Sequence, residues 1–179
     1  MKRLFILPIL ISICFSSFAQ KFISDQSRIR FYSSAPVEDI EAINEQSKSV
    51  IDLESGAFAF TVPSNQFQFK KKLMQEHFNE NYMESEKFPK STFTGKVKNW
   101  DELKDEEKIF ASGELTIHGV TKTVDIPATL ITQTDRLIVD GVFPIALAEY
   151  KIKIPKALFY NIADTVKVTV HFEYKPFVK

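Results

Sequence analysis

The stretch that decides the fold spans residues 113–126 and reads GELTIHGVTKTVDI. Its apolar residues alternate with polar ones on both sides of the pair His118-Gly119. A period of two residues places one face of a β-strand on a core, and glycine reaches the positive φ that a two-residue hairpin turn requires. We therefore predict a tight antiparallel hairpin with strands at residues 114–117 and 122–126.

The same alternation runs along most of the chain on either side of this hairpin. Turn-forming sequences separate the alternating runs at residues 54–56, 134–135 and 163–164. Many short strands at regular spacing are typical of an antiparallel sandwich or barrel. The apolar positions of these runs are Ile29, Phe31, Phe58, Phe60, Val62, Phe93, Val97, Leu137, Val139, Ile152, Ile154, Val166, Val168, Val170 and Phe172.

One helix is predicted among the strands, at Lys70–Met83, where helix-forming residues place their apolar side chains on one face. The stretch Pro36–Ser47 has apolar residues at every third position, so it fits either a helix edge or an irregular strand. Loops are expected at Asn99–Lys108, which is mostly polar, and at Pro155–Asp164, where the proline ends a strand at Tyr150–Ile154.

Length and composition narrow the class of protein. The chain has 179 residues, 23 Lys and Arg against 23 Asp and Glu, one Cys and 17 Phe. A formal net charge of zero argues against a nucleic-acid binder, which needs a surplus of basic residues. The hydrophobic fraction of 44% is too high for a disordered chain, and one Cys excludes a disulfide scaffold.

Residues 1–19 have the three parts of a secretory signal peptide. Lys2 and Arg3 are basic, Leu4–Phe15 is uncharged and apolar, and Ala19 precedes the predicted cleavage site. The apolar run is shorter than the roughly 20 residues that span a bilayer. The alternatives are an N-terminal membrane anchor and a lipoprotein signal at Cys14. Cleavage leaves a single domain at residues 20–179 with a net charge of −2, no cysteine and 14 phenylalanines.

Patterns that carry catalysis are scarce. The chain lacks G-x-S-x-G, the phosphate-binding P-loop and H-E-x-x-H. His77 and Glu80 have the spacing of two metal ligands but no recognisable third, and His118 has no identifiable Asp or Ser partner. The run Lys70–Lys72 fits an anionic headgroup, although a solvated helix start is the simpler interpretation. We therefore predict no enzyme activity, no metal and no cofactor.

The phenylalanines are the strongest functional signal. Phe contributes a wide apolar surface without a polar atom that needs a partner, and a barrel of about eight strands can leave room for one ligand. For any single Phe, ordinary core packing is the simpler explanation. We nevertheless predict an apolar lumen that holds a lipid. The candidate lumen residues are Phe58, Phe60, Val62, Phe67, Phe69, Leu73, Phe78, Phe93, Phe110, Phe143 and Phe172.

Several spaced motifs resemble the YceI-like family of exported lipid- or polyisoprenoid-binding proteins, in the family's order. The strongest is the block at residues 113–122, and the resemblance extends from Phe22 to Tyr174. A histidine that many members carry in the lead-in to the first strand is absent here. The other motifs are Ser27–Phe31, Leu73-Met74-x-x-His77-Phe78, Phe88–Gly95, Tyr150–Pro155 and Val166–Phe172.

This resemblance implies an all-β, lipocalin-like, up-and-down antiparallel barrel of about eight strands, with the helix at Lys70–Met83 near a barrel mouth. It favours an irregular strand at Ile40–Asp52 over a helix. It also implies periplasmic residence, an apolar lipid partner, no catalytic residues and a possible homodimer.

Two hypotheses follow for the function. In the first, the protein is a periplasmic carrier that encloses an apolar lipid, plausibly a polyisoprenoid. In the second, side chains fill the barrel, and the protein acts in envelope stress or structure through a protein partner. An isoprenoid-modifying or hydrolytic enzyme is a third and weaker alternative.

Overall fold

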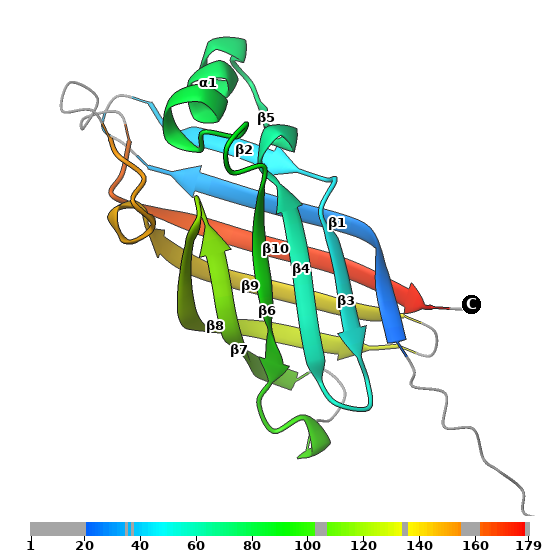
Figure 1. Ribbon diagram of the computed structural model, residues 1–179. Helices are drawn as coiled ribbons and strands as arrows, with labels where there is room; N and C mark the ends of the chain where they lie inside the picture. The colour runs from blue at the N-terminus through cyan, green and yellow to red at the C-terminus, as the bar shows by residue number, and fades with distance from the viewer. Residues whose placement is uncertain are drawn as a thin grey trace, which may run out of the picture.

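A computed structural model of the chain describes residues 21–34, 36, 38–102, 107–133, 136–154 and 162–177. The predicted signal peptide at residues 1–19 lies outside this described part. Antiparallel strands make up most of it (Figure 1). The strands are β1 (Lys21–Ser33), β2 (Ile40–Asn44), β3 (Lys48–Asp52), β4 (Ala57–Pro63), β5 (Gln68–Phe69), β6 (Lys90–Val97), β7 (Glu107–Ile117), β8 (Val120–Thr132), β9 (Leu137–Ala146) and β10 (Thr165–Pro176).

Eight of these strands form a closed barrel. The hydrogen-bonded order is β10-β9-β8-β7-β6-β4-β3-β1, and a pairing between β10 and β1 closes the circuit. The short strands β2 and β5 extend the sheet from β1 outside that circuit. The predicted all-β barrel of about eight antiparallel strands is therefore confirmed.

Strand β1 belongs to both parts of the sheet because its two halves have different partners. Its first residues, Lys21–Ile23, pair with β3, and its last residues, Ile29–Ser33, pair with β2. The register along β10 shifts between Ser24 and Gln26, which marks a β-bulge that bends the strand. The irregular strand predicted at Ile40–Asp52 is thus two strands, β2 and β3.

The hairpin at His118-Gly119 is confirmed. Ile117 of β7 pairs with Val120 of β8, so the turn contains only two residues. Both have positive φ, 49° for His118 and 72° for Gly119, as a type I′ turn requires. A Cβ at Gly119 would lie 2.4 Å from the Phe88 ring, so glycine is needed for space as well as for conformation.

Helical residues cover one end of the barrel. The α-helix α1 (Lys72–His77) continues as a π-helical segment, η2 (Phe78–Tyr82), and we call the two together the mouth helix. It lies within the predicted helix at Lys70–Met83 and sits at the end of the barrel beside β2 and β5 (Figure 1). None of its residues is fully buried. No helix among the described residues is long and apolar enough to cross a bilayer.

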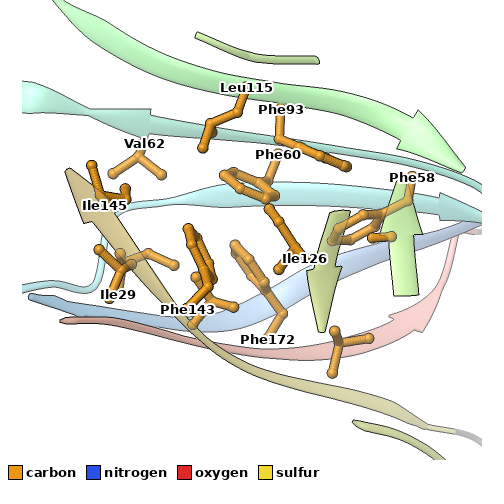
Figure 2. Close-up of a cluster of buried hydrophobic side chains, with 14 of the residues drawn as sticks. Ile29, Phe58, Phe60, Val62, Phe93, Leu115, Ile126, Phe143, Ile145 and Phe172 are labelled. Atoms are coloured by element: carbon orange, nitrogen blue, oxygen red, sulfur yellow. The ribbon is translucent and has the colours of Figure 1, made fainter. Parts of the chain in front are cut away.

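The opposite end of the barrel is filled by side chains. At the inner border of this end, Phe60 stacks on Phe93 with ring centroids 5.3 Å apart, and Phe172 lies 5.9 Å from Phe60. Figure 2 shows these rings converging from different strands on the barrel interior. Beyond them, the buried Tyr174 hydroxyl and the Ser49 hydroxyl form a 2.7 Å hydrogen bond. We call this half the filled end.

The predicted strand at Tyr150–Ile154 is wrong. A 3₁₀ helix, η4 (Leu147–Tyr150), ends at Lys151, whose φ of 58° reverses the chain. Ile152 is nevertheless buried and Lys153 is exposed. The alternation in the sequence therefore predicted correctly which side chains face inward, although the segment is not a strand. The predicted loop at Asn99–Lys108 contains a short 3₁₀ helix, η3 (Trp100–Glu102), and the start of β7. Residues 103–106 and 155–161 lie outside the described part.

Candidate functional site

A cavity of about 450 Å³ occupies the half of the barrel beneath the mouth helix. Its walls come mainly from β1, β4, β7, β9 and β10, and the mouth helix closes it from above. The volume lies within the roughly 300–1,000 Å³ typical of small-molecule sites. The barrel therefore has a hollow end and a filled end.

The hollow end is lined almost entirely by apolar side chains. Ser33 and Ser91 are the polar residues of the wall. The other polar lining residues lie on the mouth helix (His77 and Tyr82) or just before it (Lys71). The Ser33 hydroxyl is already engaged, because it accepts a 2.8 Å hydrogen bond from the Ala163 N–H. Burial raises the pKa of the Tyr82 phenol, which stays neutral at ordinary pH. Such a lining favours an apolar ligand, since few polar groups in it would hold water.

Four phenylalanines form a second aromatic cluster at the mouth. Phe31, Phe67, Phe69 and Phe78 have neighbouring ring centroids 5.1–5.7 Å apart. They come from β1, from the segment around β5 and from the mouth helix. All four line the cavity. We call them the mouth cluster, and they are the apolar contact between the mouth helix and the barrel.

The predicted lumen residues fall into three groups. Phe58, Phe93 and Phe172 lie at the filled end, where they pack on one another and on Phe60. Phe110 lies outside the barrel and is 51% exposed, because Ile109 and Ala111 take the inward positions on β7. Its place in the predicted lumen is therefore wrong. The other seven, which line the cavity, are Phe60, Val62, Phe67, Phe69, Leu73, Phe78 and Phe143.

Most of the remaining wall consists of aliphatic residues that the prediction did not include. Val166, Val168 and Val170 line the cavity from consecutive inward positions of β10. Their strict alternation in the sequence predicts that they face inward, but valine, unlike phenylalanine, does not by itself indicate a lumen. Met74 and Met83 had no such signal, because their position depends on how the mouth helix lies over the barrel. The other unpredicted apolar lining residues are Ile29, Phe31, Ile40, Leu115, Ile117, Ile145, Leu147, Ile152 and Ile162.

The charged residues at the mouth form ion pairs, one exposed and one partly buried. Lys71 donates a 2.6 Å hydrogen bond to Glu38, and Arg30 donates one of the same length to Glu41. The Arg30 guanidinium holds the pKa of the Glu41 carboxyl below its usual range. The described residues contain no group of three or more His, Cys, Asp or Glu that could hold a metal, and His77 with Glu80 belongs to none.

His118 has partners that sequence reasoning could not identify. Its Nε2 lies 2.8 Å from Glu84 Oε2, and its Nδ1 lies 3.2 Å from the Tyr150 carbonyl oxygen. The imidazole also packs against the Phe88 ring, with centroids 4.5 Å apart. The partners come from two separate loops at the mouth, so no local pattern could have revealed them.

Comparisons with known proteins agree with this geometry. The family model of the YceI-like domain matches residues 21–174. No curated protein matches the chain in sequence.

Three solved structures share the fold at low sequence identity. A polyisoprenoid binding domain from Saccharophagus degradans is 18% identical with a TM-score of 0.74, over 87% of this chain and 98% of that one. BcnA of Burkholderia cenocepacia is 20% identical with a TM-score of 0.71, over 82% and 95%. The YCEI protein of Campylobacter jejuni is 17% identical with a TM-score of 0.65, over 82% and 90%.

Proposed function

The chain belongs to the YceI-like family, and we propose on this basis that it is a binding protein that encloses an apolar lipid in the hollow end of its barrel. One observation carries the proposal: a cavity of about 450 Å³ whose wall is apolar and whose cover is a helix without buried residues. A core that only stabilises the fold would be packed to the density of an organic crystal and would leave no such space.

The proposed mechanism is burial of hydrocarbon. Each CH₂ group moved from water into the cavity contributes about 0.8 kcal/mol, while the ordering of a long chain and of the mouth helix opposes binding. Affinity therefore depends on the shape of the cavity more than on headgroup contacts. The few polar groups support this idea, because Ser33 is hydrogen-bonded within the protein and Lys71 is paired with Glu38.

A polyisoprenoid is the proposed ligand class. The domain from Saccharophagus degradans that shares the fold is described as polyisoprenoid binding. The wall also supports the proposal, since its Val, Ile and Phe side chains make dispersion contacts with a hydrocarbon chain. We further propose that residues 1–19 direct the chain to the periplasm and that cleavage follows Ala19. Binding rather than catalysis is the proposed role.

Native mass spectrometry with organic extraction tests the proposal directly. The purified protein should carry an apolar molecule, and after delipidation it should rebind geranylgeraniol in preference to the unbranched stearyl alcohol. Val168 faces the cavity beside Phe143, so Val168→Phe should fill the space and reduce rebinding at least tenfold.

The chain offers a matched control in Val142, which neighbours Phe143 but is 52% exposed on the outer face. Val142→Phe adds the same ring outside the barrel and should leave rebinding unchanged. Equal loss in both variants, or a protein that rebinds neither alcohol, would overturn the proposal. Equal binding of the two alcohols would retain a lipid carrier but exclude the isoprenoid preference.

The outer wall supports a second role, contact with a protein partner. Phe110 is paired with Pro127 across β7 and β8, and the continuing register places Val142 of β9 opposite Pro127. All three are exposed, so an apolar row crosses three adjacent strands. We propose that the partner is a second copy of this chain and that this row is the face of the homodimer. Phe110→Ser should then lower the sedimentation-derived mass from dimer to monomer, and a wild-type monomer at high concentration would contradict the idea.

A further inference from the structure

His118 joins three segments at the mouth of the barrel. It occupies the turn between β7 and β8, its Nε2 contacts the Glu84 carboxylate, and its Nδ1 faces the Tyr150 carbonyl oxygen. Its side chain is only 10% exposed, because Phe88 packs against the ring. Glu84 lies two residues beyond the end of the mouth helix, and its φ of 43° shows where the chain turns away.

The chemistry of the two partners selects one form of the ring. A carboxylate and a carbonyl oxygen both accept hydrogen bonds and neither donates. A neutral imidazole carries one N–H, so one of its nitrogens would point a lone pair at an acceptor. The imidazolium carries two N–H groups and donates to both Glu84 and Tyr150. Both hydrogen bonds can therefore form together only when the His118 ring carries two protons.

The rest of the mouth helix is held more loosely. At its N-terminal end, the described polar ties are the exposed Lys71–Glu38 pair and a 3.3 Å hydrogen bond from the Phe69 N–H to Gln75 Oε1. Its Phe78 also contacts the other rings of the mouth cluster, and such apolar contacts are not directional. The Lys71–Glu38 pair is exposed on both sides and contributes little, whereas the His118 imidazole is largely buried, so we take the His118–Glu84 contact as the main described polar tie of this helix.

We propose that His118 fastens the C-terminal end of the mouth helix as a doubly protonated clasp, and that loss of the ring proton loosens this helix and speeds exchange of the enclosed ligand. The second half of this statement rests on the proposed lipid-binding function, whereas the first half does not. His118 is a positioning residue, because it does not line the cavity. Ligand exchange should therefore be slow in acidic solution and faster in alkaline solution.

The charged groups around the ring are few. Glu84 and Lys87 come from the segment after the mouth helix, and the Lys87 ammonium lies over Phe88. Lys122 of β8 is paired with Glu149 of η4 at 3.0 Å, and Lys151 follows Tyr150. Burial raises the pKa of the Tyr150 phenol, so this group stays neutral where histidine titrates. Glu84 is the one carboxylate among them with a hydrogen bond to the ring.

Hydrogen–deuterium exchange of the delipidated protein tests the clasp without reference to any ligand. After correction for the intrinsic pH dependence of exchange, peptides covering residues 72–83 should open about fivefold more between about pH 5 and pH 8. Glu84→Gln should abolish this dependence. The amide can donate to a neutral ring through its NH₂ or accept from a charged one through its oxygen, so both ring forms are fully paired. His118→Asn, which tolerates the left-handed turn, should raise exchange at every pH.

The chain has only three histidines, which makes the controls complete. His171 is paired with Asp140 at 2.7 Å on the outer wall, so His171→Asn removes the same chemistry away from the mouth and should keep the pH response. His77 lies on the mouth helix itself, and His77→Asn should also keep it. A response that disappears with His77→Asn, or that persists in either Glu84→Gln or His118→Asn, would overturn the clasp.

The ligand arm of the experiment is separate. In protein loaded with geranylgeraniol, the dissociation rate should rise with pH by the same factor, and Glu84→Gln should remove that rise. Failure of geranylgeraniol to bind would reject the proposed function while leaving the exchange result intact. A pH-independent dissociation rate beside pH-dependent exchange would reject the link between the clasp and ligand release.

Discussion

At the scale of single residues, Tyr174 combines complete burial with a polar group. Its hydroxyl is hydrogen-bonded to Ser49, and the Ser49 hydroxyl in turn donates to the Ala59 carbonyl oxygen at 2.8 Å. Because that donor is in use, Tyr174 supplies the proton between the two hydroxyls. Burial raises the pKa of the Tyr174 phenol, so the folded protein keeps it protonated.

This burial has a consequence for alkaline stability. The unfolded chain loses the Tyr174 proton above about pH 10, and the folded chain does not. The stabilisation is therefore complete below that pH and decreases as the pH rises through it. Tyr174→Phe should cost about 1 kcal/mol at neutral pH and flatten the alkaline decrease. Urea denaturation at neutral pH and above about pH 10 measures the free energy of unfolding of the two proteins. An equally steep alkaline decrease in Tyr174→Phe would show that the Tyr174 phenol is not its cause.

At the scale of elements, the phenylalanines divide into two clusters with different roles. The filled end holds only a void of about 10 Å³, whereas the mouth cluster lies between the mouth helix and the cavity. Phe93 is completely buried, and Phe78 is only partly buried. The same substitution should therefore mainly affect stability at Phe93 and mainly affect ligand dissociation at Phe78.

Phe93→Ala should destabilise the protein by about 3–5 kcal/mol, because it opens a cavity among rings that cannot collapse. Phe78→Ala should cost less stability, because the mouth helix has little buried area to lose, but it should accelerate ligand dissociation. Thermal unfolding of both variants measures the stability loss, and ligand dissociation rates of both variants measure the effect on binding. A larger stability loss in Phe78→Ala than in Phe93→Ala would show that the mouth helix is part of the core.

The elements also show how far sequence alone could go. Alternation predicted the barrel and the hairpin at His118, because a period of two reports which face of a strand is buried. It could not separate Phe58 and Phe172 at the filled end from Phe60 and Phe143 beside the cavity. All four face inward, and only strand tilt and stagger decide their depth. The prediction for Phe110 was wrong for a simpler reason. Its neighbours Ile109 and Ala111 are the buried residues of β7, so Phe110 faces outward.

At the scale of the whole molecule, the two ends of the described chain meet. The Phe177 N–H donates a 2.7 Å hydrogen bond to the Lys21 carbonyl oxygen. This meeting point lies away from the mouth helix (Figure 1). A circular permutant is therefore feasible, because a short Gly/Ser linker can join the ends without distorting the barrel.

New ends between Glu54 and Ser55, in the exposed turn between β3 and β4, leave the cavity intact. This permutant should fold and bind geranylgeraniol like the parent protein. Opening the chain between His118 and Gly119 should instead loosen the mouth helix, even where the barrel folds. Circular dichroism and the rebinding assay compare the two. A permutant opened at Glu54 that does not fold would show that the order of strand formation matters.

The pairing of β1 with β10 determines when the barrel can close during folding. The first strand is bonded to the last along ten residue pairs, from Phe22–Pro176 to Tyr32–Lys167. A growing chain holds β1 with one edge unpaired until β10 emerges, because β10 is the strand that pairs with that edge. Contacts between such distant segments also form slowly. The barrel therefore closes only after β10 has been made, so a chaperone can act on the open sheet until that moment.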